Sequence, residues 1–181
     1  MTLMATPRDS NSAALGRAVR PVHATTPSAP FRDVMAHMAA PVSVITAARD
    51  GVGSGATVSA LMSLSMTPEM LVVALDRSSS TLEMIRSTRR FGVNILAAGQ
   101  LDLAMHFASK APDKFADLAW CLESGIPRLA GVSGWVRCTV DRIQPGGDHV
   151  LVSGLVESAH HDPGQSPMTY HGRTFGTHAP Q

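Results

Sequence analysis

The sequence has few cysteines and no surplus of either charge. Its 181 residues include only two cysteines, Cys121 and Cys138, which are far apart and form no CxxC pair. A disulfide framework is therefore not expected, and a reducing cytoplasm is the natural setting for the chain. With 15 basic and 14 acidic residues the net charge is +1. The chain therefore lacks the excess of basic residues that is typical of nucleic-acid-binding proteins.

Long apolar runs are also missing. The longest, Met70 to Leu75, is far shorter than the roughly 20 residues of a membrane-spanning helix. Near the N-terminus, Arg17 and Arg20 interrupt the apolar stretch that a signal peptide needs. Residues 1–29 are rich in Ala, Ser, Thr and Pro without a clean period. We predict a disordered or loosely docked tail there, followed by one domain over residues 30–181.

The common motifs of nucleotide and hydrolase chemistry do not occur. There is no GxGxxG after a predicted strand, no GxxxxGK[ST] loop, no GxSxG elbow and no HExxH. The sequence therefore does not predict a Rossmann fold, a P-loop or a serine hydrolase. His160 and His161 are adjacent, and adjacent residues of a strand face opposite sides. We predict no metal site.

The chain does contain six segments that are typical of strands, at residues 42–48, 55–60, 70–76, 91–96, 135–143 and 149–157. The last two alternate cleanly and are joined by the turn Pro145-Gly146-Gly147-Asp148, which predicts a hairpin. The segment 70–76 is continuously apolar, so we expect it to be buried on both faces. Short connections between strands favour a mainly β fold, an antiparallel barrel with a few peripheral helices, over a doubly wound parallel sheet.

Three helices are predicted beside these strands. Apolar residues at helical spacing predict the first after Pro30 and the third near residue 101, and Ser80-x-x-Glu83 is a capping box that predicts the second. The apolar face of the first helix comprises Phe31, Val34, Met35, Met38 and Ala39, and Pro41 ends it. The apolar face of the third helix comprises Leu101, Ala104, Met105 and Ala108.

Small hydroxyl residues cluster in two places. Residues 57–67 carry them at the end of the second strand and in the loop that we expect after it, and residues 78–81 carry them at the start of a helix. A helix N-terminus offers free N–H groups and a positive dipole end, and Arg77, Lys110 and Lys114 are near in sequence. This arrangement suits a phosphate group. The alternative is that Ser80 only caps the helix and its neighbours are solvated.

Two shorter motifs have plain explanations when they are taken alone. Gly and Asp in Gly147-Asp148-His149 are favoured in turns for backbone reasons, and a histidine that starts a strand is usually half-exposed. Lys114-Phe115 can equally be a surface lysine beside a core phenylalanine.

Together, these segments resemble the flavin reductase family with the FMN-binding split barrel. The resemblance covers about residues 31–175, and its most specific parts are the TVSALMSLSMTP block at 57–68 and the GDH turn at 147–149. Ala60 departs from the family pattern, since many relatives have a second serine there. The resemblance implies an antiparallel Greek-key split barrel that forms a homodimer, with the flavin in a groove near the subunit interface.

The resemblance also implies which residues bind the flavin. Residues 57–59 match the strand that lines it, 63–65 the loop at its ring and ribityl chain, 79–81 its phosphate end, and 114–115 the segment that closes over it. The cofactor-binding residues are therefore expected to be Thr57, Val58, Ser59, Ser63, Leu64, Ser65, Ser79, Ser80, Thr81, Lys114 and Phe115.

The nicotinamide is expected to stack near Asp148 and His149, the two residues to which the resemblance gives a catalytic role. Tyr170 and Arg173 match the C-terminal edge of the site. The expected function is reduction of FMN or FAD by NADH or NADPH, and supply of the reduced flavin to a partner monooxygenase. Because the cofactors carry the hydride chemistry, no nucleophile or strong base is required. The alternatives are a flavin-binding electron carrier, an oxidase of the pyridoxamine-phosphate type and a purely structural barrel.

Overall fold

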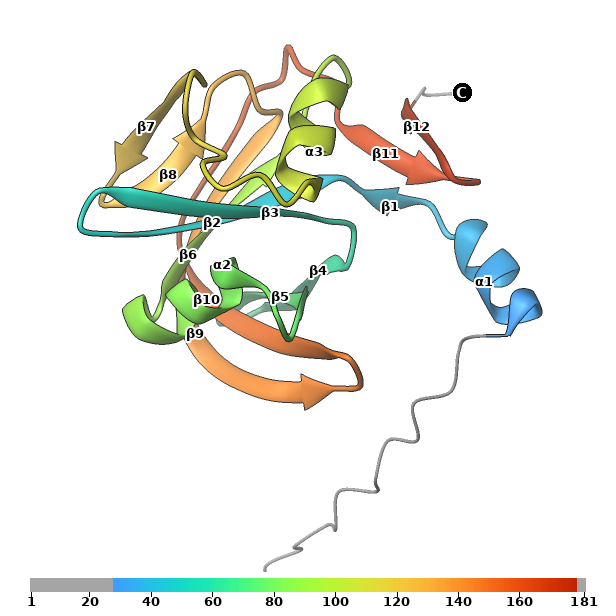
Figure 1. Ribbon diagram of the computed structural model, residues 1–181, viewed down its shortest axis with the longest axis horizontal. Coiled ribbons are helices and arrows are strands. Elements are labelled where there is room, and N and C mark those ends of the chain that lie inside the picture. Colours follow the sequence, from blue (N-terminus) through green and yellow to red (C-terminus); the bar gives the residue numbers. More distant parts are fainter. Residues whose placement is uncertain (1–27, 179–181) are drawn as a thin grey trace, which may run out of the picture.

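The structure is a computed structural model that describes residues 28–178, so the predicted tail lies outside the described residues except for residues 28 and 29 (Figure 1). The described chain contains α1 (Ala29–Ala36), β1 (Ala40–Pro41), β2 (Ser43–Arg49), β3 (Val52–Val58), β4 (Leu61–Met66), β5 (Glu69–Asp76), α2 (Ser80–Thr88), β6 (Arg90–Ile95), α3 (Leu101–Ala108), β7 (Trp120–Glu123), β8 (Ile126–Leu129), β9 (Gly134–Gly146), β10 (His149–His161), β11 (Met168–His171) and β12 (Thr174–Thr177). None of its helices is long and apolar enough to cross a membrane.

Seven of these strands form one antiparallel sheet in the order β3-β2-β6-β9-β10-β5-β4. Its two edge strands, β3 and β4, follow each other in the chain and are separated only by Ser59 and Ala60. A two-residue link cannot span the width of a flat seven-stranded sheet, in which neighbouring strands lie about 4.8 Å apart. The sheet therefore curls, and the predicted antiparallel barrel is confirmed. Two small sheets, β1-β11-β12 and β7-β8, complete the fold.

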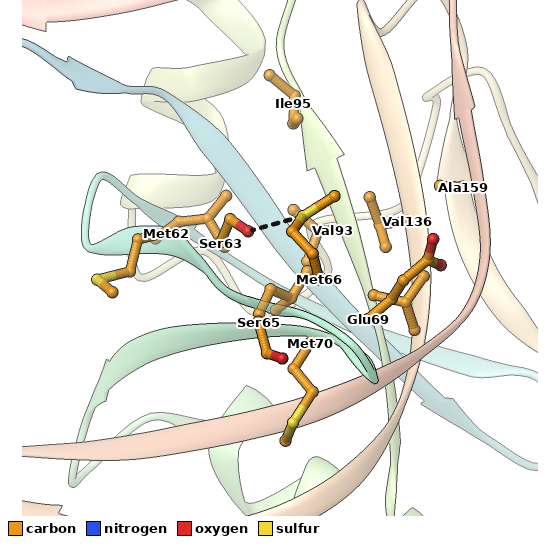
Figure 2. Close-up of a pocket in the computed structure, with 13 residues that line it drawn as sticks. Met62, Ser63, Ser65, Met66, Glu69, Met70, Val93, Ile95, Val136 and Ala159 are labelled. Carbon is orange, nitrogen blue, oxygen red and sulfur yellow. Dashed lines mark hydrogen bonds between the residues drawn. The ribbon is translucent and has the colours of Figure 1, made fainter.

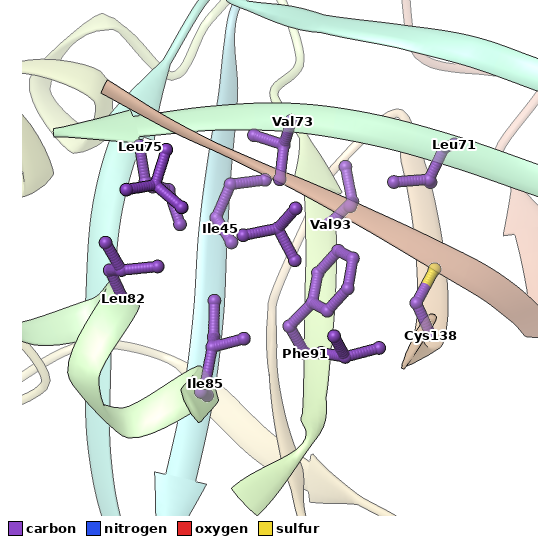
Figure 3. Packing of buried hydrophobic residues seen from close by; sticks show 13 residues of the cluster. Ile45, Leu71, Val73, Leu75, Leu82, Ile85, Phe91, Val93 and Cys138 are labelled. Carbon is purple, nitrogen blue, oxygen red and sulfur yellow. The ribbon is translucent and has the colours of Figure 1, made fainter. Parts of the chain in front are cut away.

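The barrel interior is filled by apolar side chains from both halves of the curled sheet. Ile45 of β2 and Val73 of β5 belong to one buried cluster with Phe91 of β6 (Figure 3). Leu82 and Ile85 of α2 extend toward the same cluster and are fully buried. Each such side chain contributes about 1.5–3 kcal/mol through burial, so α2 is held on the barrel by its apolar face.

A second buried cluster lies on the other side of the β2–β6 region. There α3, the β7–β8 hairpin and the loop that joins them pack on the sheet, and the cluster contains Phe107, Phe115 and, from β9, Trp135. Phe115 packs edge-to-face on Phe107 and on Trp120, with ring centroids 5.2 and 5.0 Å apart. This cluster fixes the loop that precedes β7 against the barrel.

The predicted hairpin is confirmed as β9–β10, and the strands predicted at 42–48, 55–60, 70–76 and 91–96 correspond to β2, β3, β5 and β6. The expectation that 70–76 is buried on both faces is wrong. Leu71, Val73 and Leu75 are buried, whereas Met70, Val72 and Ala74 on the other face are half-buried. That second face lines a surface hollow instead of a core.

The predicted helices form, with different ends and faces. The capping box is wrong because the cap of α2 is Ser79, whose hydroxyl accepts a hydrogen bond from the Leu82 amide at 3.4 Å. In α3 the buried residues are Ala104, which belongs to the predicted apolar face, and Phe107, which does not. Met105 of the predicted face is exposed. A Cβ on Gly55 would lie 2.5 Å from Cε1 of Phe107, so the glycine makes the room that selects this face.

The first helix is shorter than predicted and its apolar face is exposed. It ends at Ala36, and none of its residues is buried. Phe31, Val34 and Met38 are 58, 67 and 59% exposed. Figure 1 shows α1 at the edge of the molecule, beyond β1 and away from the barrel. Helical periodicity therefore identified an apolar face that nothing in residues 28–178 covers.

Substitution of Gly92 tests how tightly the sheet packs on the second cluster. A Cβ at Gly92 would lie 2.1 Å from Cη2 of Trp135, so Gly92→Ala forces the indole or the strand to move. We expect a loss of about 1–3 kcal/mol in the free energy of unfolding, measured by urea denaturation. Gly99→Ala is the control, because a Cβ there meets nothing within 4 Å. Equal stability of the two variants would contradict this packing.

Candidate functional site

One edge strand, β3, brings together most of the predicted cofactor residues. The Thr57 hydroxyl donates to the main-chain oxygen of Ala104 in α3 at 2.7 Å. Lys114 donates from Nζ to the main-chain oxygens of Gly55, at 3.3 Å, and Phe107, at 2.8 Å. Burial lowers the pKa of Lys114 below its usual value. Hydrogen bonds from Thr57 and Lys114, both predicted as site residues, therefore connect β3 with α3 and with the loop that follows α3.

The start of α2 meets the same strand through hydroxyl groups. Ser54 Oγ lies 3.0 Å from Thr81 Oγ1 and 3.4 Å from Ser80 Oγ, both within hydrogen-bonding distance. Thr81 is buried and Ser80 is exposed. Because Ser80 opens the helix, its hydroxyl lies beside the positive end of the helix dipole.

The turn before α2 is built by a carboxylate. Asp76 Oδ1 accepts hydrogen bonds from the Ser78 amide at 2.7 Å and from the Ser78 hydroxyl at 2.6 Å. These bonds, the side-chain one first, lower the pKa of Asp76. The carboxylate therefore stays ionised and holds residues 76–79 in a tight turn that presents the N-terminus of α2.

The β9–β10 hairpin places Asp148 and His149 beside this turn. In the β5–β10 pairing His149 lies opposite Asp76, and the Arg77 amide donates to the main-chain oxygen of Asp148 at 3.3 Å. His149 Nδ1 lies 2.8 Å from Asp148 Oδ1, and this hydrogen bond is the main cause of a lowered pKa of Asp148. The imidazole is thus oriented by its neighbour, and its side chain stays 43% exposed.

Two adjoining hollows meet at Ser59, and we call them together the Ser59 groove. The first has a volume of about 410 Å³ and an apolar wall; it is lined by Met38, Ala39, Ala40, Pro41, Ser59, Ala60, Leu61, Met62, Val72, Val73, Ala74 and Leu151. The second has about 360 Å³ and is lined by Val42, Thr57, Val58, Ser59, Met105, Tyr170, Arg173 and Phe175. The groove runs along the seam between the two sheet edges.

His149 lies on the sheet face that forms the floor of this groove. Residues two apart in a strand share a face, so His149 of β10 points to the same side as Leu151, and its partner Asp76 to the same side as Ala74. Leu151 and Ala74 line the first hollow. An apolar hollow that contains the Ser59 hydroxyl, with an imidazole further along the same sheet face, suits a flat heteroaromatic ligand.

A family model described as "Flavin reductase like domain" matches residues 35–179 of this chain. The chain belongs to the flavin reductase family. It is accordingly an oxidoreductase, a flavin reductase.

Individual relatives agree with the family assignment. The reductase component of 4-nitrophenol 4-monooxygenase/4-nitrocatechol 2-monooxygenase from Rhodococcus opacus is 40% identical over 152 residues, 84% of this chain and 82% of the relative. A flavin reductase of Pseudomonas putida is 33% identical over 81% of this chain and 87% of its own length. Among solved structures, an NADH:FAD oxidoreductase of Streptomyces globisporus, in complex with NAD and FAD fragments, has a TM-score of 0.78 and 29% identity, covering 83% of this chain and 92% of that one.

Of the eleven predicted cofactor residues of the flavin reductase, Thr57, Val58 and Ser59 line the Ser59 groove, and the other eight do not. Residues 63–65 belong to strand β4, not to the predicted loop. Ser63 and Ser65 line another hollow of about 310 Å³, which shares Leu61 and Met62 with the first hollow of the groove; there the Ser63 hydroxyl points toward the sulfur of Met66 at 3.9 Å (Figure 2). Leu64 sits at a register shift and is 46% exposed. Their contact with flavin stays a prediction.

Phe115 also differs from its predicted surroundings. Its side chain is buried in the second cluster, and a Cβ on Gly53 would lie 3.0 Å from its ring. The ring therefore anchors the segment that carries Lys114. Sequence reasoning missed Ser54, Leu151 and Met105, which contact or line the site. The Gly-Ser-Gly pattern at 53–55 was a usable signal, since small residues allow a close approach of neighbouring chain.

Proposed function

We propose that this flavin reductase binds FMN or FAD in the Ser59 groove, reduces it with NADH or NADPH, and supplies the reduced flavin to a partner monooxygenase. The observation that carries the proposal is the groove itself, which has an apolar floor, the Ser59 hydroxyl at its centre and the Asp148–His149 pair at the end of the same sheet face. The names of relatives as monooxygenase reductase components support the supply of reduced flavin.

The residues of the groove fit a flavin. Val72, Ala74 and Leu151 offer an apolar surface for the isoalloxazine ring, and Thr57 and Ser59 offer hydroxyls along β3. The hydroxyls of Ser54 and Ser80 and the N-terminus of α2 offer donors for the phosphate of the ribityl chain. FMN and FAD share the ring and this phosphate, so the same residues serve both. We also propose a cytoplasmic setting, which keeps Cys121 and Cys138 as the free thiols that the structure contains.

A bound flavin supplies the redox chemistry, since its N5 accepts a hydride from C4 of a reduced nicotinamide. The protein holds the two rings at reacting distance and excludes water from between them. We assign the orienting role to His149, whose imidazole is fixed by Asp148 at 2.8 Å. No proton transfer by His149 is required, because the hydride carries both electrons.

We further propose that the flavin reductase is a homodimer. Phe31 and Val34 of α1 have exposed apolar side chains, and Met38, which follows the helix, is also exposed and lines the Ser59 groove. Met62 and Met66 of β4 add 58 and 76% exposed side chains. Contiguous apolar surface of this kind marks an interaction site. A second copy of this chain would cover it and close the groove from outside.

Anaerobic reduction tests the function directly. Addition of NADH or NADPH to the protein with FMN or FAD is expected to bleach the flavin absorbance far faster than in a protein-free control. An electron carrier would bind flavin without bleaching it. Oxidation of pyridoxamine phosphate would indicate the oxidase alternative, and absence of flavin binding would indicate a structural barrel.

Replacement of His149 tests its assigned role. His149→Ala is expected to lower kcat/KM for the dinucleotide about tenfold or more, which corresponds to ~1.4 kcal/mol of transition-state stabilisation, while the flavin dissociation constant changes less than about twofold, within the error of such binding free energies. The matched control is His161→Ala, at the exposed far end of β10. Unchanged turnover in His149→Ala, measured by stopped-flow absorbance, would show that the imidazole does not position the nicotinamide.

A charge placed on α1 tests the dimer. Val34→Glu is expected to shift the protein to monomers in sedimentation velocity, because a buried carboxylate in an apolar interface is costly. Val52→Glu is the control: Val52 is 65% exposed, close to the 67% of Val34, but it is the first residue of β3, and the β2–β3 turn beside it lies at the other side of the molecule from α1 (Figure 1). A monomeric wild-type protein, or equal effects of both variants, would refute this interface.

A further inference from the structure

A second hollow lies on the reverse side of the hairpin that carries His149. It has a volume of about 400 Å³ and lies between α2 and the β9–β10 hairpin; its lining residues are Arg77, Arg86, Ile143, Gln144, Pro145 and Val150. We call it the reverse-side pocket. Because His149 and Val150 are adjacent in a strand, their side chains point to opposite faces. One hairpin therefore separates this pocket from the Ser59 groove.

The two arginines of the reverse-side pocket are not used by the fold. Within residues 28–178, neither guanidinium has a hydrogen-bond acceptor or a carboxylate partner. By contrast, Arg90, Arg128 and Arg137 all form ion pairs with glutamates. The Arg77 amide donates to the Asp148 carbonyl, which fixes the backbone from which this side chain extends. Two unpaired guanidiniums at one hollow are suited to a phosphate group.

The opposite wall of the pocket suits a purine. Ile143, Pro145 and Val150 provide apolar surface, and Gln144 provides an amide that can both donate and accept hydrogen bonds. No aspartate or glutamate lines the pocket. A site that reads the free ribose of NADH usually carries such a carboxylate, whereas arginine accommodates the 2′-phosphate of NADPH.

The hairpin tip leaves a path between the two sides. Gly146 and Gly147 have no side chains, and a Cβ at Gly147 would meet nothing within 4 Å. A ligand can therefore pass over the tip from His149 toward Pro145 without meeting a side chain of either glycine.

We propose that the reverse-side pocket binds the 2′-phosphorylated adenosine of NADPH, with Arg77 and Arg86 on the phosphate, and that the enzyme prefers NADPH to NADH. This inference rests on the proposed function, because it places the far end of a dinucleotide whose nicotinamide lies at His149. It makes the reverse-side pocket the determinant of cosubstrate choice, separate from the residues that hold the flavin.

Steady-state kinetics with both dinucleotides test the preference. The wild-type enzyme is expected to show a higher kcat/KM with NADPH, and Arg86→Ala to lower that value at least tenfold through KM, with less than a threefold change for NADH. Arg142→Ala is the control, since Arg142 is an exposed arginine of the same hairpin outside the pocket. A wild-type preference for NADH, or equal effects of the two variants, would overturn the proposal.

Calorimetry on the full chain tests the pocket without any turnover. We expect 2′,5′-ADP to bind at least tenfold more tightly than 5′-AMP, and Arg86→Ala, but not Arg142→Ala, to abolish the difference. Equal binding of the two nucleotides would refute the pocket even if the enzyme reduces flavin. If the protein reduces flavin with neither dinucleotide, the proposed function fails, and the calorimetric result still decides whether the pocket reads the 2′-phosphate.

Discussion

The two-residue link between β3 and β4 is the constraint on which the rest of the structure depends. It joins the first and last strands of a seven-stranded sheet, so the sheet has to curl until its edges meet. A hydrogen bond from the Ala74 amide to the Ala60 carbonyl, 2.9 Å long, ties the link to β5. The curl encloses the cluster around Phe91 and leaves Ser59 at the seam. Barrel closure and the position of the groove therefore have the same cause.

The same curl explains why the floor of the groove is apolar although it faces outward. Strands β5 and β10 cross the barrel wall, so each turns one set of residues to the core and the other to the groove. Val73 and Val152 are fully buried, while Val72, Ala74 and Leu151 remain half-buried. A continuously apolar strand is costly on a free surface, because its outer face stays in water. The proposed flavin and the proposed second copy of the chain would cover that face and remove this cost.

The sequence predicted those features whose signal is local. Alternation identified the β9–β10 hairpin, a β-branched run identified β2, and short, largely apolar runs identified β5 and β6, because in these strands one face packs on the core. Strand β4 was missed because its hydroxyl residues, Ser63 and Ser65, are typical of loops, and only pairing with β5 makes it a strand.

Long-range packing decided the remaining differences. The space at Gly55 selects Phe107 as a buried residue of α3, and periodicity alone could not say whether α1 is covered by its own chain. For the site, the hydroxyl clusters predicted donors, but only the register of β5 and β10 places His149 opposite Asp76, beside the turn before α2.

The two faces of the β9–β10 hairpin contact different parts of the enzyme, so each face can be substituted separately. Residues that alternate along β10 serve different neighbours: His149 and Leu151 face the groove, and Val150 faces α2 and the arginines. Substitutions on the α2 side can therefore change which nucleotide is held without moving the groove side, provided that the ladder with β5 is kept. The two proposed binding determinants, on the two faces of one strand, would allow a small barrel to combine a fixed geometry for hydride transfer with an adjustable choice of hydride donor.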